Sequence, residues 1–219
     1  MSGDGAAATL RFAELVAARI CHDLSSPLSI IASAAELARL EGERGVRQGG
    51  VGQGGEAMAL MLEAGRDIAA RVQFFRRLFG PALGPIAGGE LIELAKTVLG
   101  GGRIAIEAGS FGGDSAFPAE AARAALAALV VAAEALPRGG TIRCRGEAAD
   151  FALTLDGPAA AWPAHLTAVL GGAEPIGAAL EGGARGLMGP FLVLAAAEAR
   201  LRPTLLLGAG VPLLRLAAE

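Results

Sequence analysis

The sequence predicts an α+β protein, in which a two-helix hairpin forms a dimeric four-helix bundle and is followed by a two-layer α/β sandwich. Two long segments at the start carry apolar residues at alternating steps of three and four, and shorter helical and alternating patterns follow them. The chain has 219 residues, of which 53% are hydrophobic and 19% charged, so it can bury a large core. We therefore expect a helical domain over residues 1–82 and an α/β domain over residues 83–219.

The first long segment predicts a helix from Leu10 to about Leu40. Its apolar positions are Ala13, Ala17, Ile20, Leu24, Leu28, Ile31, Ala35 and Ala38. A polar, glycine-rich stretch over residues 41–56 predicts a loop, and a second helix should run from Glu56 to Phe79. Its apolar positions are Met58, Met61, Gly65, Ile68, Val72, Phe75 and Phe79. One hairpin cannot bury two such seams, so we expect a homodimer in which two hairpins pack around a two-fold axis.

Beyond Pro85 the pattern changes to short helices mixed with short strands. Helices are predicted over residues 90–99, 117–136, 162–170 and 186–200. Strands are predicted over residues 103–108, 139–147 and 150–157, and a strand hairpin over residues 203–217 that turns at residues 208–210. This mixture is typical of a two-layer α+β domain.

The composition excludes several functions. A net charge of −3 without a basic cluster argues against nucleic-acid binding. Cys21 and Cys144 are far apart and form neither a disulfide framework nor a zinc motif. No basic segment followed by a long apolar run marks a signal peptide. The uncharged runs over residues 186–197 and 203–214 are shorter than the ~20 residues that span a bilayer. We expect a cytoplasmic protein without membrane or nucleic-acid partners.

His22 lies on the polar side of the first predicted helix. At 100° per residue it falls about 160° from Leu24, and small or charged residues share its side. These residues are Arg19, Ser26, Ser29 and Ser33. An exposed imidazole is largely neutral at pH 7 and can act as a nucleophile. Asp23 could accept a hydrogen bond from the other ring nitrogen and support the imidazolium that forms on attack.

Pro27 follows His22 by five residues and interrupts the predicted helix. A proline inside a helix removes one backbone hydrogen bond and pushes on the carbonyl four residues earlier, here that of Asp23. We therefore expect a kink just beyond His22 that loosens the turn carrying it.

The run from His22 to Pro27, "HDLSSP", resembles the phospho-acceptor box of histidine kinases. A closer resemblance is to the ChpT-type bacterial histidine phosphotransferases, through "ARICHDLSSPLSII", "VQFFRRLFGP" and "AAEALPRGGTIR". The resemblance implies a phosphorelay protein that shuttles a phosphoryl group between receiver-domain aspartates by way of His22 and Asp23. The partners would be receiver domains of a hybrid histidine kinase and of response regulators. Their contacts would fall on Arg19, Ser25, Ser26, Ser29 and Ser33.

The second domain resembles a kinase ATP-binding domain that has lost its ligands. Ala127 and Val131 stand where such kinases have two asparagines, and neither can bind magnesium or phosphate. The first glycine box keeps only Asp156 in "DGPAAAWP". The last box, "EGGARGLMGP", keeps Gly183, Gly186 and Leu187. We expect no cofactor and no metal in this chain, with Mg²⁺ carried by the receiver partner.

Two alternatives stay open at this point. A divergent but active histidine kinase would bind ATP and label His22 from it. A non-catalytic dimeric adaptor would bind receiver domains while His22 stayed unreactive. The second histidine, His165, lies in a short amphipathic helix and is interpreted as a packing or surface residue.

Overall fold

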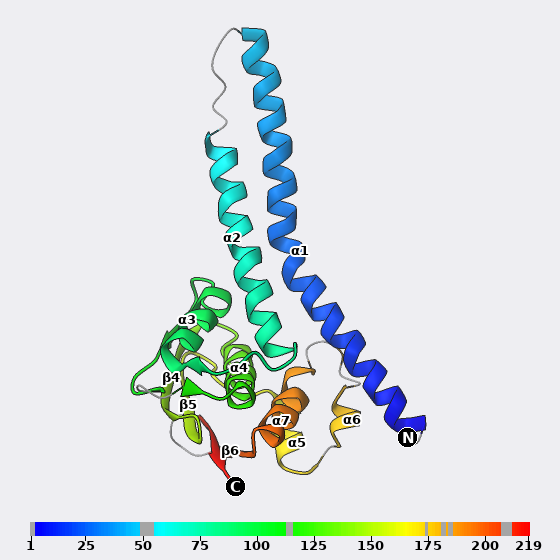
Figure 1. The fold of residues 1–219 in the computed structure, drawn as a ribbon, viewed down its shortest axis with the longest axis vertical. Coiled ribbons are helices and arrows are strands. Elements are labelled where there is room, and N and C mark those ends of the chain that lie inside the picture. Colours follow the sequence, from blue (N-terminus) through cyan, green and yellow to red (C-terminus); the bar gives the residue numbers. More distant parts are fainter. Residues whose placement is uncertain are drawn as a thin grey trace.

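The computed structural model describes residues 3–48, 55–112, 116–173, 175–180, 183, 186–206 and 212–219. Two long helices, α1 (Gly3–Gln48) and α2 (Gly55–Leu78), form a stalk that stands on the rest of the chain (Figure 1). The helices of the lower part are α3 (Gly88–Leu99), α4 (Ala119–Glu134), α5 (Ala164–Leu170), α6 (Ile176–Ala179) and α7 (Met188–Glu198). A helical hairpin followed by a mixed helix and sheet region confirms the predicted α+β class and the order of its two parts.

The strands of the lower part form two sheets. They are β1 (Ile86–Ala87), β2 (Ile104–Glu107), β3 (Ala116–Phe117), β4 (Gly140–Glu147), β5 (Asp150–Asp156), β6 (Leu201–Leu206) and β7 (Leu213–Ala218). Five of them make a sheet in the order β2-β4-β5-β7-β6, in which β2 pairs parallel to β4 and the other pairs are antiparallel. The predicted pairing of the last two strands is confirmed, although the predicted turn at residues 208–210 lies outside the described residues. The pair β1–β3 and helix α6 are too short to be predicted from periodicity.

Helix α4 is the centre of the lower core. Almost every side chain from Ala121 to Ala132 is buried, between the sheet on one side and α3 and α7 on others. Alternation on the strands supplies the facing layer, because Ile142, Leu153 and Leu155 are buried while their neighbours along the strands are not. Alanine dominates α4, and its small side chain lets neighbouring elements approach closely on all sides.

The stalk differs from the predicted hairpin in its length and in its seams. Helix α1 begins before Leu10 and continues to Gln48, so residues 41–48 are helical rather than loop; residues 49–54 lie outside the described part. The predicted apolar seams of the two helices are correct only in part, because Leu28, Met58 and Val72 are exposed. Each helix carries more apolar surface than one neighbour can cover, so the half that does not face the other helix stays uncovered.

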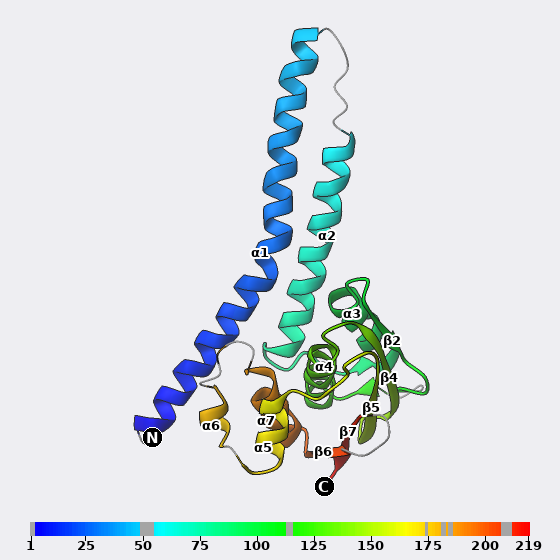
Figure 2. The same ribbon diagram turned by 180° about the vertical axis from the view of Figure 1, so that it is seen from behind.

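Helix α1 bends along its length, as Figures 1 and 2 show. Pro27 lies inside the helix and is buried, which accounts for a bend at this point. The residues after the bend run alongside α2, whereas those before it lean away from α2 and over the lower part (Figure 2). There Phe12 stacks on Phe191 of α7 with ring centroids 5.9 Å apart, and Leu15 is buried. The predicted kink therefore redirects the helix onto the second part of the chain.

By length and composition, one described helix could cross a membrane. A window within Gly5–Glu43 of α1 has a mean hydropathy of 1.2 and is 11% buried. Uncharged runs do not reveal this segment, because Arg19 and Asp23 interrupt it. Core helices and signal sequences near an N-terminus meet the same criterion, so it carries no conclusion about location.

Two adjacent glycines at the start of α3 give a matched test of how closely the backbone of α3 approaches that of Gly112. A Cβ atom on Gly88 would lie 2.7 Å from Cα of Gly112, whereas one on Gly89 would meet nothing within 4 Å. We predict that Gly88→Ala lowers the free energy of unfolding by about 1–3 kcal/mol, because two backbones must separate. Gly89→Ala should leave it unchanged or raise it by up to ~1 kcal/mol. Urea unfolding of both variants measures the difference, and equal midpoints would contradict the close approach.

Candidate active site

His22 lies in the part of α1 before the bend, where the helix crosses the lower part of the chain. Its side chain is 87% exposed, as the helical wheel predicts. Nδ1 lies 3.0 Å from Oδ1 of Asp23. A carboxylate only accepts hydrogen bonds, so the neutral ring donates from Nδ1 and keeps its lone pair on Nε2. The site therefore presents a nucleophilic nitrogen to an approaching partner.

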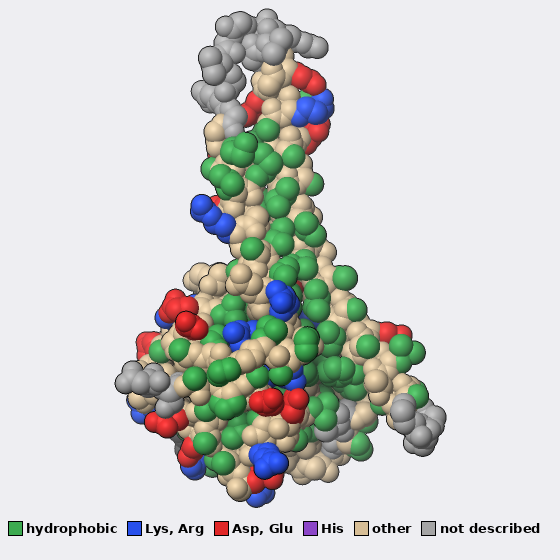
Figure 3. Space-filling model, viewed as in Figure 1, with side chains coloured by type: hydrophobic (Ala, Val, Ile, Leu, Met, Phe, Trp, Pro, Cys, Tyr) green, Lys and Arg blue, Asp and Glu red, His purple; other side chains and the backbone are tan. Residues whose placement is uncertain are grey.

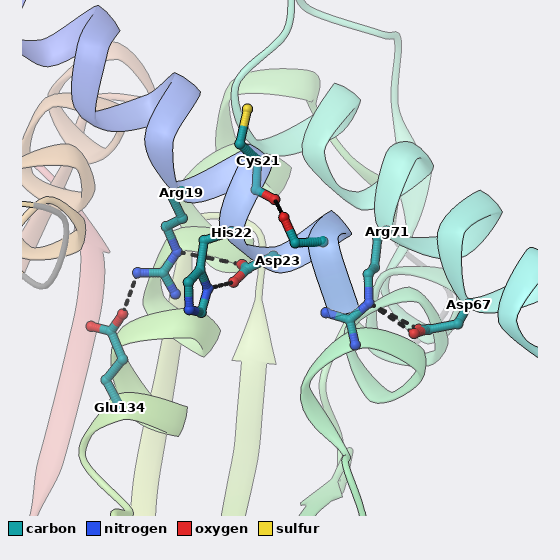
Figure 4. A network of polar contacts seen from close by, with 8 residues as sticks. Arg19, Cys21, His22, Asp23, Asp67, Arg71 and Glu134 are labelled. Atoms are coloured by element: carbon teal, nitrogen blue, oxygen red, sulfur yellow. Dashed lines mark hydrogen bonds and ion pairs between the residues drawn. The ribbon is translucent and has the colours of Figure 1, made fainter. Parts of the chain in front are cut away.

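Asp23 belongs to a chain of charges that reaches the second part of the protein (Figure 4). Its Oδ2 lies 3.8 Å from Nε of Arg19, one turn earlier on α1. Nη1 of Arg19 donates to Oε1 of Glu134 over 2.6 Å, and Glu134 is the last residue of α4. Burial raises the pKa of Glu134, while the charge of Arg19 and the hydrogen bond from it lower this pKa.

Sequence analysis missed Glu134. It is the acidic residue that ends α4, and it follows a run of apolar residues from Ala124 to Ala133, which is the local signal that singles it out. Its partner on α1 could not be found from periodicity or spacing, because 115 residues separate Arg19 from Glu134.

The serines of the predicted contact surface have two different environments. Ser25 donates to the carbonyl of Cys21 over 2.6 Å, and Ser29 donates to the carbonyl of Ser25 over 2.9 Å. Such bonds to the preceding turn favour bending of a helix, so these hydroxyls act together with Pro27. A groove of about 570 Å³ opens beside them between α1 and α2. It is lined by Ser26, Ser29, Ile30, Ser33, Ala34, Leu37 and Leu60.

A larger cavity of about 840 Å³ lies where α1 crosses the lower part. Its lining comes from α1, from the end of α4 and from the start of α5: Ala18, Arg19, His22, Asp23, Glu134, Pro137, Pro163 and His165. The structure thus brings His165 to the same cavity as His22, a contact that no local pattern predicts. The four predicted serines do not line this cavity.

The positions that resemble a kinase ATP site have other environments in the described structure. Ala127 and Val131 are fully buried in the core. Asp156 pairs with Arg143 over 3.0 Å on the outer face of the sheet, away from the helices. Of the last glycine box, residues 181, 182, 184 and 185 lie outside the described part. Within the described residues, no group of three or more His, Cys, Asp or Glu side chains could hold a metal ion.

Comparisons with known proteins agree with this arrangement. A family model described as the histidine phosphotransferase C-terminal domain matches residues 88–201, more than half of the chain. Protein phosphotransferase ChpT of Brucella abortus (strain 2308) is 29% identical over 171 residues, covering 74% of this chain and 75% of that protein.

A solved structure supports the same family. This structure, of a bacterial phosphotransferase, superposes with a TM-score of 0.70 and 25% identity, covering 94% of this chain and 96% of that one. The blue-light activated histidine kinase EL346 of Erythrobacter litoralis reaches only 0.42 at 13% identity, over 95% of this chain and 58% of that one. That second likeness is too distant to support an argument. The chain belongs to the histidine phosphotransferase family, and within it to the ChpT type.

Proposed function

We propose that this histidine phosphotransferase works in a phosphorelay, in which His22 carries a phosphoryl group between the aspartates of receiver domains without using ATP. The observation that carries the proposal is the exposed His22 ring, whose Nδ1 is held by Asp23 at 3.0 Å. The family is a phosphotransferase family, and the chain offers no second exposed histidine among its described residues, since His165 is partly buried.

In the proposed step, Nε2 of His22 attacks the phosphorus of a receiver's aspartyl phosphate. A P–N bond forms, the P–O bond to the aspartate breaks, and the carboxylate leaves with the bonding electrons. The ring becomes a phospho-imidazolium that still carries its Nδ1 proton, and Asp23 stabilises this positive charge. The reverse step loads a second receiver. Transfer of this kind depends on alignment and charge stabilisation, so Mg²⁺ on the receiver can serve both directions.

The groove lined by Ser26, Ser29 and Ser33 supports docking of the receiver beside His22. It lies on the residues of α1 that follow His22, and it combines small hydroxyl side chains with the apolar Ile30, exposed at 46%. Small side chains let a folded partner approach the helix closely. Arg19 and Ser25 would lie at the edge of this docking surface, although each already has a hydrogen-bond partner within the chain.

Two features support transfer without ATP. Ala127 and Val131 are buried and carry no polar group for a nucleotide or its metal. Asp156 is engaged with Arg143 on the far face of the sheet. The proposal therefore includes no cofactor or metal in this chain. The cytoplasmic location and the absence of membrane and nucleic-acid partners stay predictions.

The uncovered apolar side chains of the stalk support a homodimer (Figure 3). On α2, Met58, Leu62 and Val72 are 53%, 56% and 41% exposed, and they fall within about 80° of the helix circumference. Leu28 of α1 is 53% exposed. A second hairpin would cover these residues in a four-helix bundle. This arrangement also explains why the predicted seams contain residues that one chain leaves exposed.

His22→Ala should abolish labelling by a receiver domain that carries ³²P on its aspartate, because the proposed acceptor nitrogen is gone. The variant should keep its circular dichroism spectrum, since His22 faces solvent. His165→Ala should still be labelled. Label on the His22→Ala variant would contradict the proposal. Label on the wild-type chain from γ-³²P-ATP would favour an active kinase, and receiver binding without any label would favour an adaptor.

Val72→Glu should convert the dimer to a monomer that remains folded. The side chain is exposed within one chain, so the charge costs little there, but burying it unpaired in a bundle costs several kcal/mol. Light scattering coupled to size exclusion measures the mass. Leu194→Glu is the matched control, because Leu194 is exposed to a similar extent in the second part of the chain. An unchanged dimer for Val72→Glu would show that this stripe is not the interface.

Ser26→Trp should weaken receiver binding by at least about tenfold, equivalent to ~1.4 kcal/mol, because an indole fills the groove. Folding should be unaffected, since Ser26 is exposed. Calorimetric titration with the receiver measures the change. Ala59→Trp adds the same indole at an exposed position of α2 outside the groove and should bind normally. Equal affinities for the two variants would show that the groove is not the docking surface.

A further inference from the structure

We propose that Glu134 is a positioning residue for His22: it holds Arg19 away from Asp23, so that Asp23 stays free to bind the imidazole. The inference rests on the proposed role of His22 as phosphoryl carrier. It gives the second part of the chain a specific task in the transfer step. Two acids, Asp23 and Glu134, compete for the guanidinium of Arg19 (Figure 4).

Arg19 has a natural partner on its own helix. Asp23 follows it by four residues, a spacing at which opposite charges on a helix pair readily. A guanidinium can also hold both oxygens of a carboxylate through its planar fork of N–H groups. In an isolated helix Arg19 would therefore compete with His22 for the Asp23 carboxylate.

Glu134 shifts this competition. Its Oε1 accepts from Nη1 of Arg19 over 2.6 Å, whereas the closest approach of Arg19 to Asp23 is 3.8 Å, which is too long for a hydrogen bond. Oδ1 of Asp23 then bonds Nδ1 of His22 at 3.0 Å. The other oxygen of Glu134 is buried and has no hydrogen-bond partner among the described residues, so Arg19 is the one polar group that this carboxylate binds.

The charges of Arg19 and Glu134 also favour the contact between Asp23 and His22. Arg19 and Glu134 neutralise each other, which leaves the negative charge of Asp23 facing the ring. Without Glu134, the positive charge of Arg19 would offset Asp23 and disfavour the phospho-imidazolium. The Arg19 and Glu134 side chains are only 20% and 24% exposed, so water and salt screen the pair less than a surface pair.

The pair connects two parts of the chain that the bend in α1 brings together. Glu134 ends α4, whose preceding turns are buried in the lower core, and this fixes the position of its carboxylate. The stacking of Phe12 on Phe191 holds the same stretch of α1 against the lower part. The position of the guanidinium is thus set by the second part of the chain, although His22, Asp23 and Arg19 all belong to α1.

The test compares single and double substitutions in the full-length chain at saturating phosphorylated receiver. Glu134→Gln keeps the shape of the side chain and removes its charge. It should slow phosphoryl transfer about fivefold, the scale of one ordinary hydrogen bond, with little change in the receiver concentration for half-maximal rate. The double variant Arg19→Gln, Glu134→Gln should recover most of the lost rate, because the competitor for Asp23 is gone. Glu198→Gln, which breaks the ion pair of α7 with Arg123 on α4, should transfer at the wild-type rate.

A spectroscopic readout separates positioning from a general structural role and does not require transfer. The ¹⁵N chemical shifts of the His22 ring report which nitrogen carries the proton, and the His22→Ala spectrum assigns them. In Glu134→Gln the Nδ1 shift should move toward the unprotonated value, and in the double variant it should move back. Unchanged shifts with a wild-type rate would overturn the proposal, as would a slow double variant. A wild-type chain that accepts no phosphoryl group would refute the proposed function, while the shifts would still decide the role of Glu134.

Discussion

A single helix, α1, has to pack against two different neighbours, and the rest of the structure depends on how it does so. Beyond Pro27 it runs alongside α2, and before Pro27 it leans onto the lower part of the chain, where Phe12 meets Phe191. A straight helix could not follow both directions. Pro27 removes one backbone hydrogen bond at the change of direction, and the hydroxyls of Ser25 and Ser29 bond carbonyls of the turns around it.

The alanine-rich core of the lower part is built around α4, which is buried over most of its length. In this chain Ala127 and Val131 point into a closed core, which favours packing against α7 and the sheet. The end of α4 has one charged residue, Glu134, and directs it toward α1. The end of α4 thus contacts the turn of α1 that precedes His22.

Local sequence patterns predicted the hairpin, most strands of the sheet and the outward direction of His22, because each depends on periodicity within one element. The Nδ1 contact with Asp23 also follows from adjacency in the sequence. The patterns could not divide the apolar residues of the stalk between an internal face and an uncovered face, so each predicted seam combines buried residues with exposed ones, such as Leu28 on α1 and Val72 on α2. Nor could they pair Arg19 with Glu134 or bring His165 to the cavity, because these contacts arise only when distant elements pack.

The bent helix also limits how proteins of this type can be recombined. Helical hairpins and the domains that follow them are often regarded as exchangeable modules. Here, however, Phe12 and Arg19 of the hairpin contact Phe191 and Glu134 of the lower part. A chimaera that joins this hairpin to the second part of a relative would keep the packing of α1 on α2 but lose both contacts, unless matching residues were transferred as pairs. The two parts of the chain should therefore evolve together, with covariation concentrated where α1 crosses α4 and α7.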